Sequence, residues 1–275
     1  MDVCYTGWTW IKSKEKDLVK CMLEDSFREL KYLGYDHTEN FAFISDYFES
    51  PEDLVALLNK YEMDLCNLYG HFTFDESSMI EMAKKQIDFL KAVGGRWYNC
   101  QHDGYKDGLP LERPMNKEKI EIIARIANAA GMYAKERSIT LTFHPHFGTC
   151  VFTEEEIDYL ASKTNPEYVS FCIDTAHTTL AGMMPEELIR KMNTRIKYMH
   201  LKDVDTNALK NAKGSDKMYT FRELGHGTVD FKAVKEALEE IEYDGMLCVE
   251  LDRPKIGNYH AAETSRKYIK DVLDL

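Results

Sequence analysis

Four side chains suited to binding a divalent cation lie at the ends of short apolar runs in the sequence. They are His144, Asp174, His200 and Glu250. Imidazole and carboxylate ligands together suit Mn, Co, Zn, Fe or Ni better than Ca, and three or four protein ligands with an open position are typical of a catalytic site. We therefore predict that these residues bind one divalent metal ion, with Mn, Co, Zn, Mg, Fe and Ni as the candidates.

The spacing of the four residues supports a shared site. From His144 to Asp174 is 30 residues, from Asp174 to His200 is 26, and from His200 to Glu250 is 50. One strand–helix unit of a parallel barrel takes about 31 residues. The four side chains are thus expected at the ends of four successive strands, with about 20 extra residues before the last strand.

Each residue also has a simpler structural interpretation. A single histidine at a strand end is commonly a hydrogen-bonded structural residue. Asp174 can be the N-cap of a helix that contains His177, and Glu250 can pair with Lys202 or Arg253. However, a glutamate inside an apolar strand is costly to bury without a partner cation. Four such positions in register favour the metal site.

The intervening sequence alternates between strand-like and helical patterns. Seven apolar runs have the length of strands: Val3–Trp8, Met63–Tyr69, Arg96–Cys100, Ile139–Phe143, Val169–Ile173, Ile196–Met199 and Met246–Leu251. An eighth, weaker strand is expected near His37–Ser45. Helical periodicity is clearest over Asn116–Glu136, which has one apolar stripe. Further helices are expected over Pro51–Tyr61, Asp75–Val93, Thr153–Lys163, Pro185–Asn193, Phe231–Ile241 and His260–Leu273.

Eight strands alternating with eight helices predict a single-domain (β/α)8 TIM barrel over residues 1–275. The alternative is a doubly wound sheet, which a glycine-rich phosphate loop after the first strand would favour. The sequence there reads Thr6-Gly7-Trp8, with no G-x-G-x-x-G motif. Catalytic residues of TIM barrels lie at the C-terminal ends of the strands, where the candidate ligands are expected.

The extra residues before the last strand run from about Val204 to Gly227. The segment is polar with little apolar periodicity, so we expect it to be largely loop. Long loops on the catalytic face are often lids. We therefore expect this segment to fold over the substrate and to bring His226 towards the pocket. The alternative is a surface insertion that contacts a neighbouring subunit.

The composition narrows the class of protein. Lys and Arg number 35 against 47 Asp and Glu, and the resulting formal charge of −12 disfavours binding to nucleic acid. No run approaches the ~20 apolar residues that span a membrane, and residues 1–10 do not read as a secretory leader. The seven cysteines form no C-x-x-C pair and are expected to be reduced thiols. A cytoplasmic protein is expected.

Five motifs, mostly in the second half of the chain, resemble those of the xylose isomerase-like barrel superfamily. They are HPHFGT at His144–Thr149, DTAH at Asp174–His177, HLKD at His200–Asp203, GHGTVD at Gly225–Asp230 and VELD at Val249–Asp252. This sugar phosphate isomerase/epimerase group includes inosose dehydratases and AP endonucleases. The first half of the chain resembles the family mainly in its alternation of strand-like and helical segments. The HPH-x-GT run resembles the inosose dehydratase branch in particular.

The resemblance implies one divalent metal held by Glu, Asp, His and Glu. Asp174, His200 and Glu250 match the last three. The first family ligand is commonly a Glu followed by Pro, whereas this chain has His144 there, and either His144 or His146 can be the first ligand. In the family's epimerases, two glutamates on opposite sides of the substrate each move a proton. A histidine in place of one of them disfavours strict epimerisation.

The chemistry that the resemblance implies is proton abstraction next to a carbonyl, through an enediolate. Glu250 is expected to be the base, and His177 or His146 to move a proton to an oxygen. Residues expected to contact the substrate are His177, Lys202, His226, Trp8, His71 and His102. Glu39 is a further candidate for the pocket wall.

We predict a metal-dependent sugar isomerase/epimerase-type enzyme acting on a sugar or keto-sugar, because isomerisation is the commonest outcome in the superfamily. The alternative is a lyase of the inosose (2-keto-myo-inositol) dehydratase type. An AP endonuclease would need three metals, for which Glu223, His226 and His71 could extend the ligand set, but the acidic charge disfavours it. A non-catalytic sugar-binding barrel is disfavoured because the key side chains are all present. The expected partner is a small carbohydrate or cyclitol, and formation of a homo-oligomer stays open.

Overall fold

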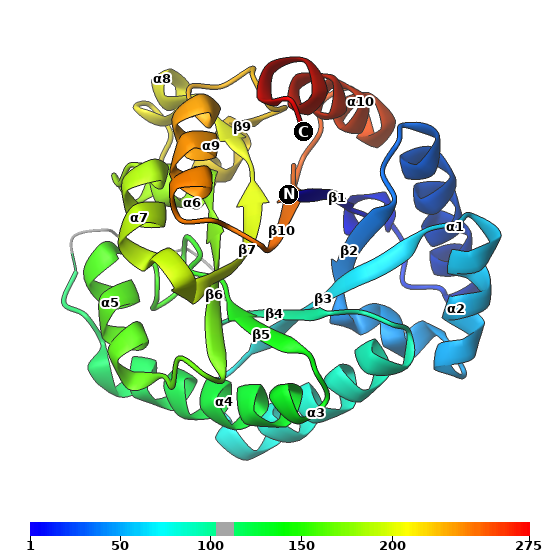
Figure 1. The fold of residues 1–275 in the computed structure, drawn as a ribbon, viewed down its shortest axis with the longest axis horizontal. Coiled ribbons are helices and arrows are strands. Elements are labelled where there is room, and N and C mark those ends of the chain that lie inside the picture. The colour runs from blue at the N-terminus through cyan, green and yellow to red at the C-terminus, as the bar shows by residue number, and fades with distance from the viewer. Residues whose placement is uncertain (103–112) are drawn as a thin grey trace.

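Eight parallel strands form a closed barrel in the computed structural model, which describes residues 1–102 and 113–275 (Figure 1). The order around the barrel is β1-β10-β7-β6-β5-β4-β3-β2, so that β1 closes against β10. The strands are β1 (Asp2–Thr6), β2 (His37–Phe41), β3 (Asp64–Phe72), β4 (Trp97–His102), β5 (Thr140–Phe143), β6 (Val169–Asp174), β7 (Ile196–Leu201) and β10 (Met246–Val249). The predicted (β/α)8 barrel is confirmed.

Helices surround the barrel and cover its outer wall (Figure 1). They are α1 (Lys16–Tyr32), α2 (Pro51–Lys60), α3 (Glu76–Ala92), α4 (Lys117–Glu136), α5 (Glu154–Lys163), α6 (Thr175–Leu180), α7 (Pro185–Met192), α9 (Phe231–Glu240) and α10 (Asn258–Tyr268). The apolar stripe of α4 is buried as its periodicity predicts, at Ile120, Ile123, Ala127 and Ala130. Within the described part of the chain, no helix has both the length and the apolar character needed to cross a membrane.

Several strand boundaries differ from the prediction, and at two of them a 3-10 helix begins where the strand was expected to continue. The chain leaves β1 at Gly7, whose backbone angles are helical (φ −88°, ψ −13°), and Trp8–Trp10 form a 3-10 helix instead of extending the strand. Similarly, Ala42–Tyr47 form a 3-10 helix after β2, where the strand was expected to run to Ser45. Both turns lie at the C-terminal ends of their strands and direct side chains towards the mouth of the barrel.

The segment between β7 and α9 is more regular than the predicted loop. It contains a two-stranded antiparallel sheet of β8 (Asp203–Val204) and β9 (Phe221–Arg222), the short helix α8 (Thr206–Leu209) and a 3-10 helix over Gly214–Thr220. The expectation of a largely loop segment was therefore wrong. Strands of two residues are too short to show an alternating pattern in the sequence.

The carboxylate of Asp203 ties the two ends of this segment together. It accepts the backbone N–H groups of Gly225, Gly227 and Val229 at 2.8–3.1 Å. A Cβ on Gly227 would lie 2.2 Å from an oxygen of Asp203, so this close approach requires glycine. The turn is fixed beside the end of β7, and it leaves His226 exposed.

The barrel interior is rich in thiols below its polar end. Cys4, Cys66, Cys172 and Cys248 are buried and pack in one cluster with Tyr198. The hydroxyl of Tyr198 lies 3.3 Å from the Sγ atom of Cys4. All cysteines in the described residues are free thiols. This packed layer closes the barrel beneath the ionisable side chains described below.

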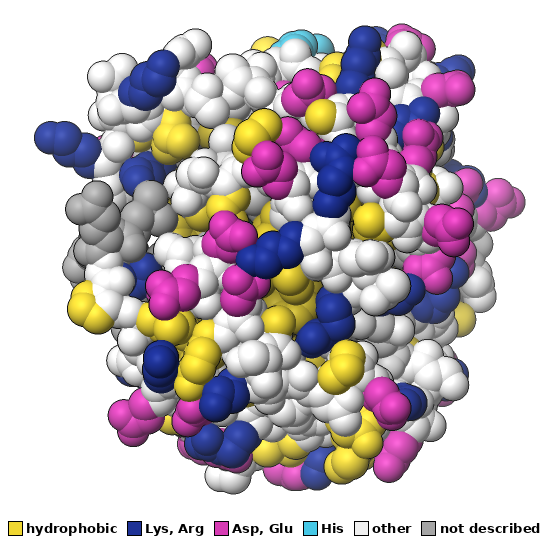
Figure 2. Space-filling view, turned by 60° about the vertical axis from the view of Figure 1, so that its left-hand side comes forward, with side chains coloured by type: hydrophobic (Ala, Val, Ile, Leu, Met, Phe, Trp, Pro, Cys, Tyr) yellow, Lys and Arg dark blue, Asp and Glu magenta, His cyan; other side chains and the backbone are white. Residues whose placement is uncertain are grey.

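The outer surface carries charge of both signs. On the face drawn in Figure 2, acidic and basic side chains are interspersed, with apolar side chains between them. Such alternation is typical of a solvated surface.

Candidate active site

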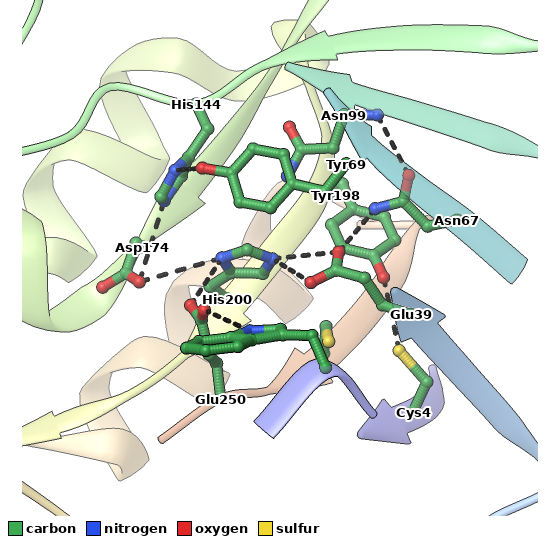
Figure 3. Close-up of polar contacts among 12 residues, drawn as sticks. Cys4, Glu39, Asn67, Tyr69, Asn99, His144, Asp174, Tyr198, His200 and Glu250 are labelled. Atoms are coloured by element: carbon green, nitrogen blue, oxygen red, sulfur yellow. Dashed lines mark hydrogen bonds and ion pairs between the residues drawn. The ribbon is translucent and has the colours of Figure 1, made fainter. Parts of the chain in front are cut away.

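Neighbouring strands carry the four predicted ligands into one buried cluster (Figure 3). His144 follows β5, Asp174 ends β6, His200 lies in β7 and Glu250 follows β10. The Nδ1 atom of His200 lies 3.0 Å from Oε2 of Glu250 and 3.8 Å from Oδ2 of Asp174. His144 Nε2 lies 3.7 Å from the same Asp174 oxygen. The structure thus brings all four side chains together.

Each of the four residues presents a buried atom that makes no hydrogen bond of normal geometry within the described part of the chain, although Oε2 of Glu250 forms an ion pair with Lys202. These atoms are His144 Nε2, Asp174 Oδ2, His200 Nδ1 and Glu250 Oε2. Buried polar atoms in folded proteins nearly always have partners. The ligand atoms of Asp174, His200 and Glu250 lie within 4.8 Å of one another. The donor set and these buried atoms therefore fit a divalent cation such as Zn or Mn.

Hydrogen bonds to Tyr69 set the tautomer of His144. The Tyr69 hydroxyl donates to Oε1 of Gln101 at 2.6 Å and also contacts Nδ1 of His144. Because the hydroxyl proton goes to Gln101, the Nδ1–H of His144 donates to the Tyr69 oxygen. Burial lowers the pKa of His144, so the ring is neutral. Its Nε2 atom therefore carries a lone pair directed into the cluster.

Lys202, expected to contact substrate, lies inside the cluster and is fully buried. Its Nζ atom is 2.7 Å from Glu250 Oε2, 3.4 Å from Asp174 Oδ2 and 3.2 Å from Asp252 Oδ2. Burial opposes ionisation of Glu250, but Lys202 and His200 outweigh it and hold the pKa of this carboxyl well below its ordinary value. Glu250 is therefore a carboxylate in the folded protein.

Asp252 is a member of the cluster that the sequence analysis did not single out. It pairs with Lys202, and burial raises the pKa of its carboxyl to about 6. The signal that could have identified it is its place in the VELD motif, two residues after Glu250. Both residues follow the end of β10 at Val249, and both carboxylates pair with Lys202.

His146 and His177 lie side by side next to the cluster. Their ring centroids are 3.9 Å apart, and the ring of His144 is 5.4 Å from that of His146 and 5.6 Å from that of His177. Burial lowers the pKa of His146 to about 3 and that of His177 well below its ordinary value. Both rings are therefore neutral. The Nδ1–H of His146 donates to the carbonyl oxygen of Phe147 at 2.7 Å, so the Nε2 atom of His146 carries the lone pair that can accept a proton.

The inserted segment reaches this site through Phe221, not through His226. Phe221 packs edge-on against His177, with ring centroids 5.4 Å apart, and lies 4.9 Å from the Lys202 ammonium. His226 is exposed in the turn that Asp203 holds, outside the buried cluster. The prediction that the segment covers the site with His226 therefore does not match the observed orientation.

Trp8 lies between the cluster and an open cavity of about 660 Å³. Its Nε1 donates to Oε1 of Glu250 at 3.4 Å, and its ring packs against Phe41 at a centroid distance of 4.9 Å. Side chains that line the cavity include Trp8, Phe41, Phe43, Tyr47, Lys12, Lys14 and Asp46. Flat rings of this kind are suited to packing against the C–H faces of a sugar.

His71 and His102 flank the mouth on β3 and β4. His71 stacks on Tyr69, with ring centroids 5.4 Å apart. His102 is buried and packs on Phe74 at 4.2 Å, and burial lowers its pKa to about 4. Their contacts are with aromatic rings at the barrel rim, which is compatible with the pocket-wall role expected of them.

Glu39 contacts the cluster directly, whereas the sequence predicted a place in the pocket wall. It is fully buried in β2, and both of its oxygens lie 3.1 Å from Nε2 of His200. The weak apolar character of HTENF at residues 37–41 marks a strand with polar side chains inside the barrel. The polar sequence of this strand does not indicate which residue Glu39 contacts.

Comparisons with known proteins agree with this geometry. Residues 27–272 match the family model of the xylose isomerase-like TIM barrel. The inosose dehydratase of Clostridium botulinum (strain Eklund 17B / Type B) is 28% identical over 292 aligned positions, covering 98% of this chain and 95% of that protein. The inosose dehydratase of Clostridium perfringens (strain 13 / Type A) is 31% identical, covering 68% and 69% respectively.

Solved structures show the same fold. The IolI protein with a bound zinc atom has a TM-score of 0.77 at 20% identity, covering 100% of this chain and 98% of that one. L-ribulose 3-epimerase has a TM-score of 0.78 at 17% identity, covering 100% and 95%. The barrel, the family match and the relatives lead to one conclusion: the chain belongs to the xylose isomerase-like TIM barrel family.

Proposed function

We propose that the protein is a divalent-metal-dependent dehydratase that acts on a polyhydroxy ketone of the inosose type. The observation that carries the proposal is the donor set itself. Glu250 supplies a carboxylate for proton abstraction, and the resemblance of the HPHFGT motif implies that His144 replaces a glutamate of the family's epimerases. One base and a separate proton relay suffice for elimination of water. The inosose dehydratase relatives, which match over 98% of this chain, support the same choice.

A divalent ion held by His144, Asp174, His200 and Glu250 would supply a Lewis acid that polarises the oxygens of the substrate. Oε2 of Glu250 faces His200, whereas Oε1 receives the indole N–H of Trp8 at 3.4 Å. Because Lys202 keeps this carboxyl ionised, Glu250 can accept the proton from the carbon next to the carbonyl. Trp8 orients the accepting oxygen.

The histidine pair handles the second proton. The ring centroids of His146 and His177 are 3.9 Å apart. A proton taken from solvent at Nε2 of His146 can pass through His177 to the departing hydroxyl, which leaves as water, and both rings are neutral again afterwards. The proton on Glu250 is later released to solvent, so that protons balance over one turnover. Phe221 covers His177 and Lys202 and helps to exclude water from the site.

Isomerisation of a sugar is the second candidate, and the buried contact between Lys202 and Glu250 favours it. A carboxyl that is shielded from solvent can retain the abstracted proton and return it to the adjacent carbon. Isomerisation is the reaction that the sequence predicts first. We place it second because a metal-bound His144 cannot replace a carboxylate base on the opposite side of the substrate.

A single assay in D2O separates the two candidates. Metal-reconstituted protein is incubated with inososes and ketoses, and the products are followed by NMR and mass spectrometry. A dehydratase yields a product lighter by one water from an inosose. Conversion of a ketose to an isomer without loss of water, with or without deuterium uptake, supports the isomerase instead. Absence of both reactions from the fully metallated protein with every compound contradicts the shared proton-abstraction step. The Glu250→Gln variant is the control.

A further inference from the structure

Glu39 and the candidate ligand His200 form a buried pair on the side of the imidazole away from the cluster. Nε2 of His200 lies 3.1 Å from both carboxylate oxygens of Glu39, whereas Nδ1 faces Glu250 at 3.0 Å (Figure 3). Both Glu39 and His200 are fully buried. The imidazole ring thus lies between a carboxylate from β2 and a carboxylate that follows β10, and these are the two strands that flank β1 in the barrel.

A ladder of polar side chains holds Glu39 in place. Asn67 on β3 donates from Nδ2 to Oε2 of Glu39 at 2.5 Å. The backbone N–H of Asn99 on β4 donates to Oδ1 of Asn67 at 3.0 Å, and Thr142 on β5 donates to Oδ1 of Asn99 at 3.2 Å. The ladder crosses four adjacent strands inside the barrel. Glu39 therefore has little freedom to move away from His200.

The chemistry of the ring assigns a proton to this contact. A neutral imidazole has one N–H and one lone pair. If Nδ1 of His200 offers its lone pair to a metal, the proton must lie on Nε2, where Glu39 accepts it. A carboxylate behind a histidine ligand fixes the tautomer and the ring plane and increases the basicity of the ligand. Burial of Glu39 away from water is costly unless such a donor is present.

We propose that Glu39 is a positioning residue for the metal site, which holds His200 in the tautomer and orientation that bind the ion. The inference rests on the metal cluster of the proposed function, but it does not depend on which reaction follows. This positioning role of Glu39 differs from a role as a ligand of the metal ion. The ligand atoms of Glu39, His200 and Cys248 lie within 4.8 Å of one another. A second ion there would need both nitrogens of His200 as ligands and therefore an imidazolate.

Glu39→Gln tests the proposal because it keeps the size of the side chain and removes its charge. The matched control is Glu156→Gln. Glu156 is also buried, but it pairs with Arg113 and caps α5 instead of contacting the cluster. Zn²⁺ and Co²⁺ affinities are measured by competition with a chelator, and the histidine tautomers of the Zn²⁺-loaded protein are read from ¹⁵N NMR.

We expect Glu39→Gln to weaken metal binding by about 10–100-fold and to reduce the Nε2–H tautomer of His200. Glu156→Gln should lower the melting temperature and leave metal affinity unchanged. Asn67→Ala removes the donor that holds Glu39 and should weaken metal binding by a smaller factor. It provides the test if the Glu39→Gln protein does not fold.

Two results would overturn the proposal. One is metal affinity within twofold of wild type for both Glu39→Gln and Asn67→Ala, with the tautomer unchanged. The other is a stoichiometry of two ions per chain that falls to one in Glu39→Gln, since Glu39 would then be a ligand. In either case the wild-type protein still binds metal, so the proposed function stands. If wild-type protein binds neither ion, both proposals fail.

Discussion

Asp174 accepts the backbone N–H of His177 through Oδ1 at 2.8 Å, while its Oδ2 is buried and faces His144 and His200. The helix-capping interpretation of Asp174 therefore holds for one oxygen, and the other remains available as a ligand. Both roles follow from the position of Asp174 at the end of β6, where the chain turns directly into α6. The two oxygens can be tested separately.

Asp174→Asn retains an oxygen that can cap α6 but removes the anionic ligand, whereas Asp174→Ala removes both. Both variants should lose the bound metal and the activity, because a neutral amide is a weaker ligand than a carboxylate. Only the alanine variant should lose about 1 kcal/mol of helix-capping free energy relative to the asparagine variant. Metal analysis and urea unfolding of the metal-free proteins check this. Full metal occupancy in both variants would exclude Asp174 as a ligand.

Glu250→Gln should lower turnover by at least roughly a hundredfold, in the range expected for loss of a general base. Exchange of the substrate proton with deuterium should fall in parallel, since the same group removes that proton. Trp8→Phe is the milder comparison, because it removes only the N–H directed at Oε1. Proton exchange at the wild-type rate in a metallated Glu250→Gln protein would show that Glu250 is not the general base.

His102 makes folding stability depend on pH. Burial lowers its pKa to about 4 in the folded protein, against about 6.5 for a free histidine. Between these values the unfolded chain binds more protons, so acidification favours unfolding. The contribution of neutral His102 is fully present above pH 6.5 and is lost as the pH falls towards 4, by about 3 kcal/mol in total.

Replacement of His102 by Gln should make the free energy of unfolding less sensitive to acid over that window. The check is urea unfolding of wild type and variant at pH 7.5 and pH 5. The stability difference between the two proteins should shift in favour of the variant at pH 5. An equal difference at both pH values would contradict the assignment of a neutral, buried imidazole.

Phe221→Ala should raise KM several-fold and lower kcat without loss of metal, because Phe221 covers His177 and Lys202. The neighbouring Tyr219 is 55% exposed and packs on Arg253, so Tyr219→Ala is the matched control and should leave both constants unchanged. Steady-state kinetics with the substrate found in the D2O screen measures both. Equal effects of the two substitutions would show that the segment acts as a whole and not through Phe221.

Removal of the inserted segment gives a coarser test of the same idea. Replacing residues 207–215 by a short glycine linker should raise KM and lower kcat while metal stays bound. Unchanged kinetics together with a new oligomeric state would favour the alternative that the segment contacts a neighbouring subunit. The deletion removes residues 207–209 of α8 and the start of the 3-10 helix that precedes β9, and it spares the turn that Asp203 holds.

The barrel and the four clustered side chains were predictable from the sequence because each depends on local pattern. Asp174 and His200 close apolar runs whose spacing matches one strand–helix unit. Contacts across the barrel were not predictable in this way. Alternation shows that Glu39 faces inward, but its pairing with His200 depends on barrel closure and on a register shift in β2, between Thr38 and Glu39. The same holds for Asp252 and Lys202.

The contacts of Asp203 with the turn at Gly225 and Gly227 have a consequence for how specificity can change. These hydrogen bonds pin the base of the inserted segment directly beside the strand that carries His200. Residues 206–220 can therefore be exchanged for a segment of different length or composition without moving the catalytic barrel. We therefore expect substrate specificity to change through this segment while the residues of the cluster beneath it keep their positions.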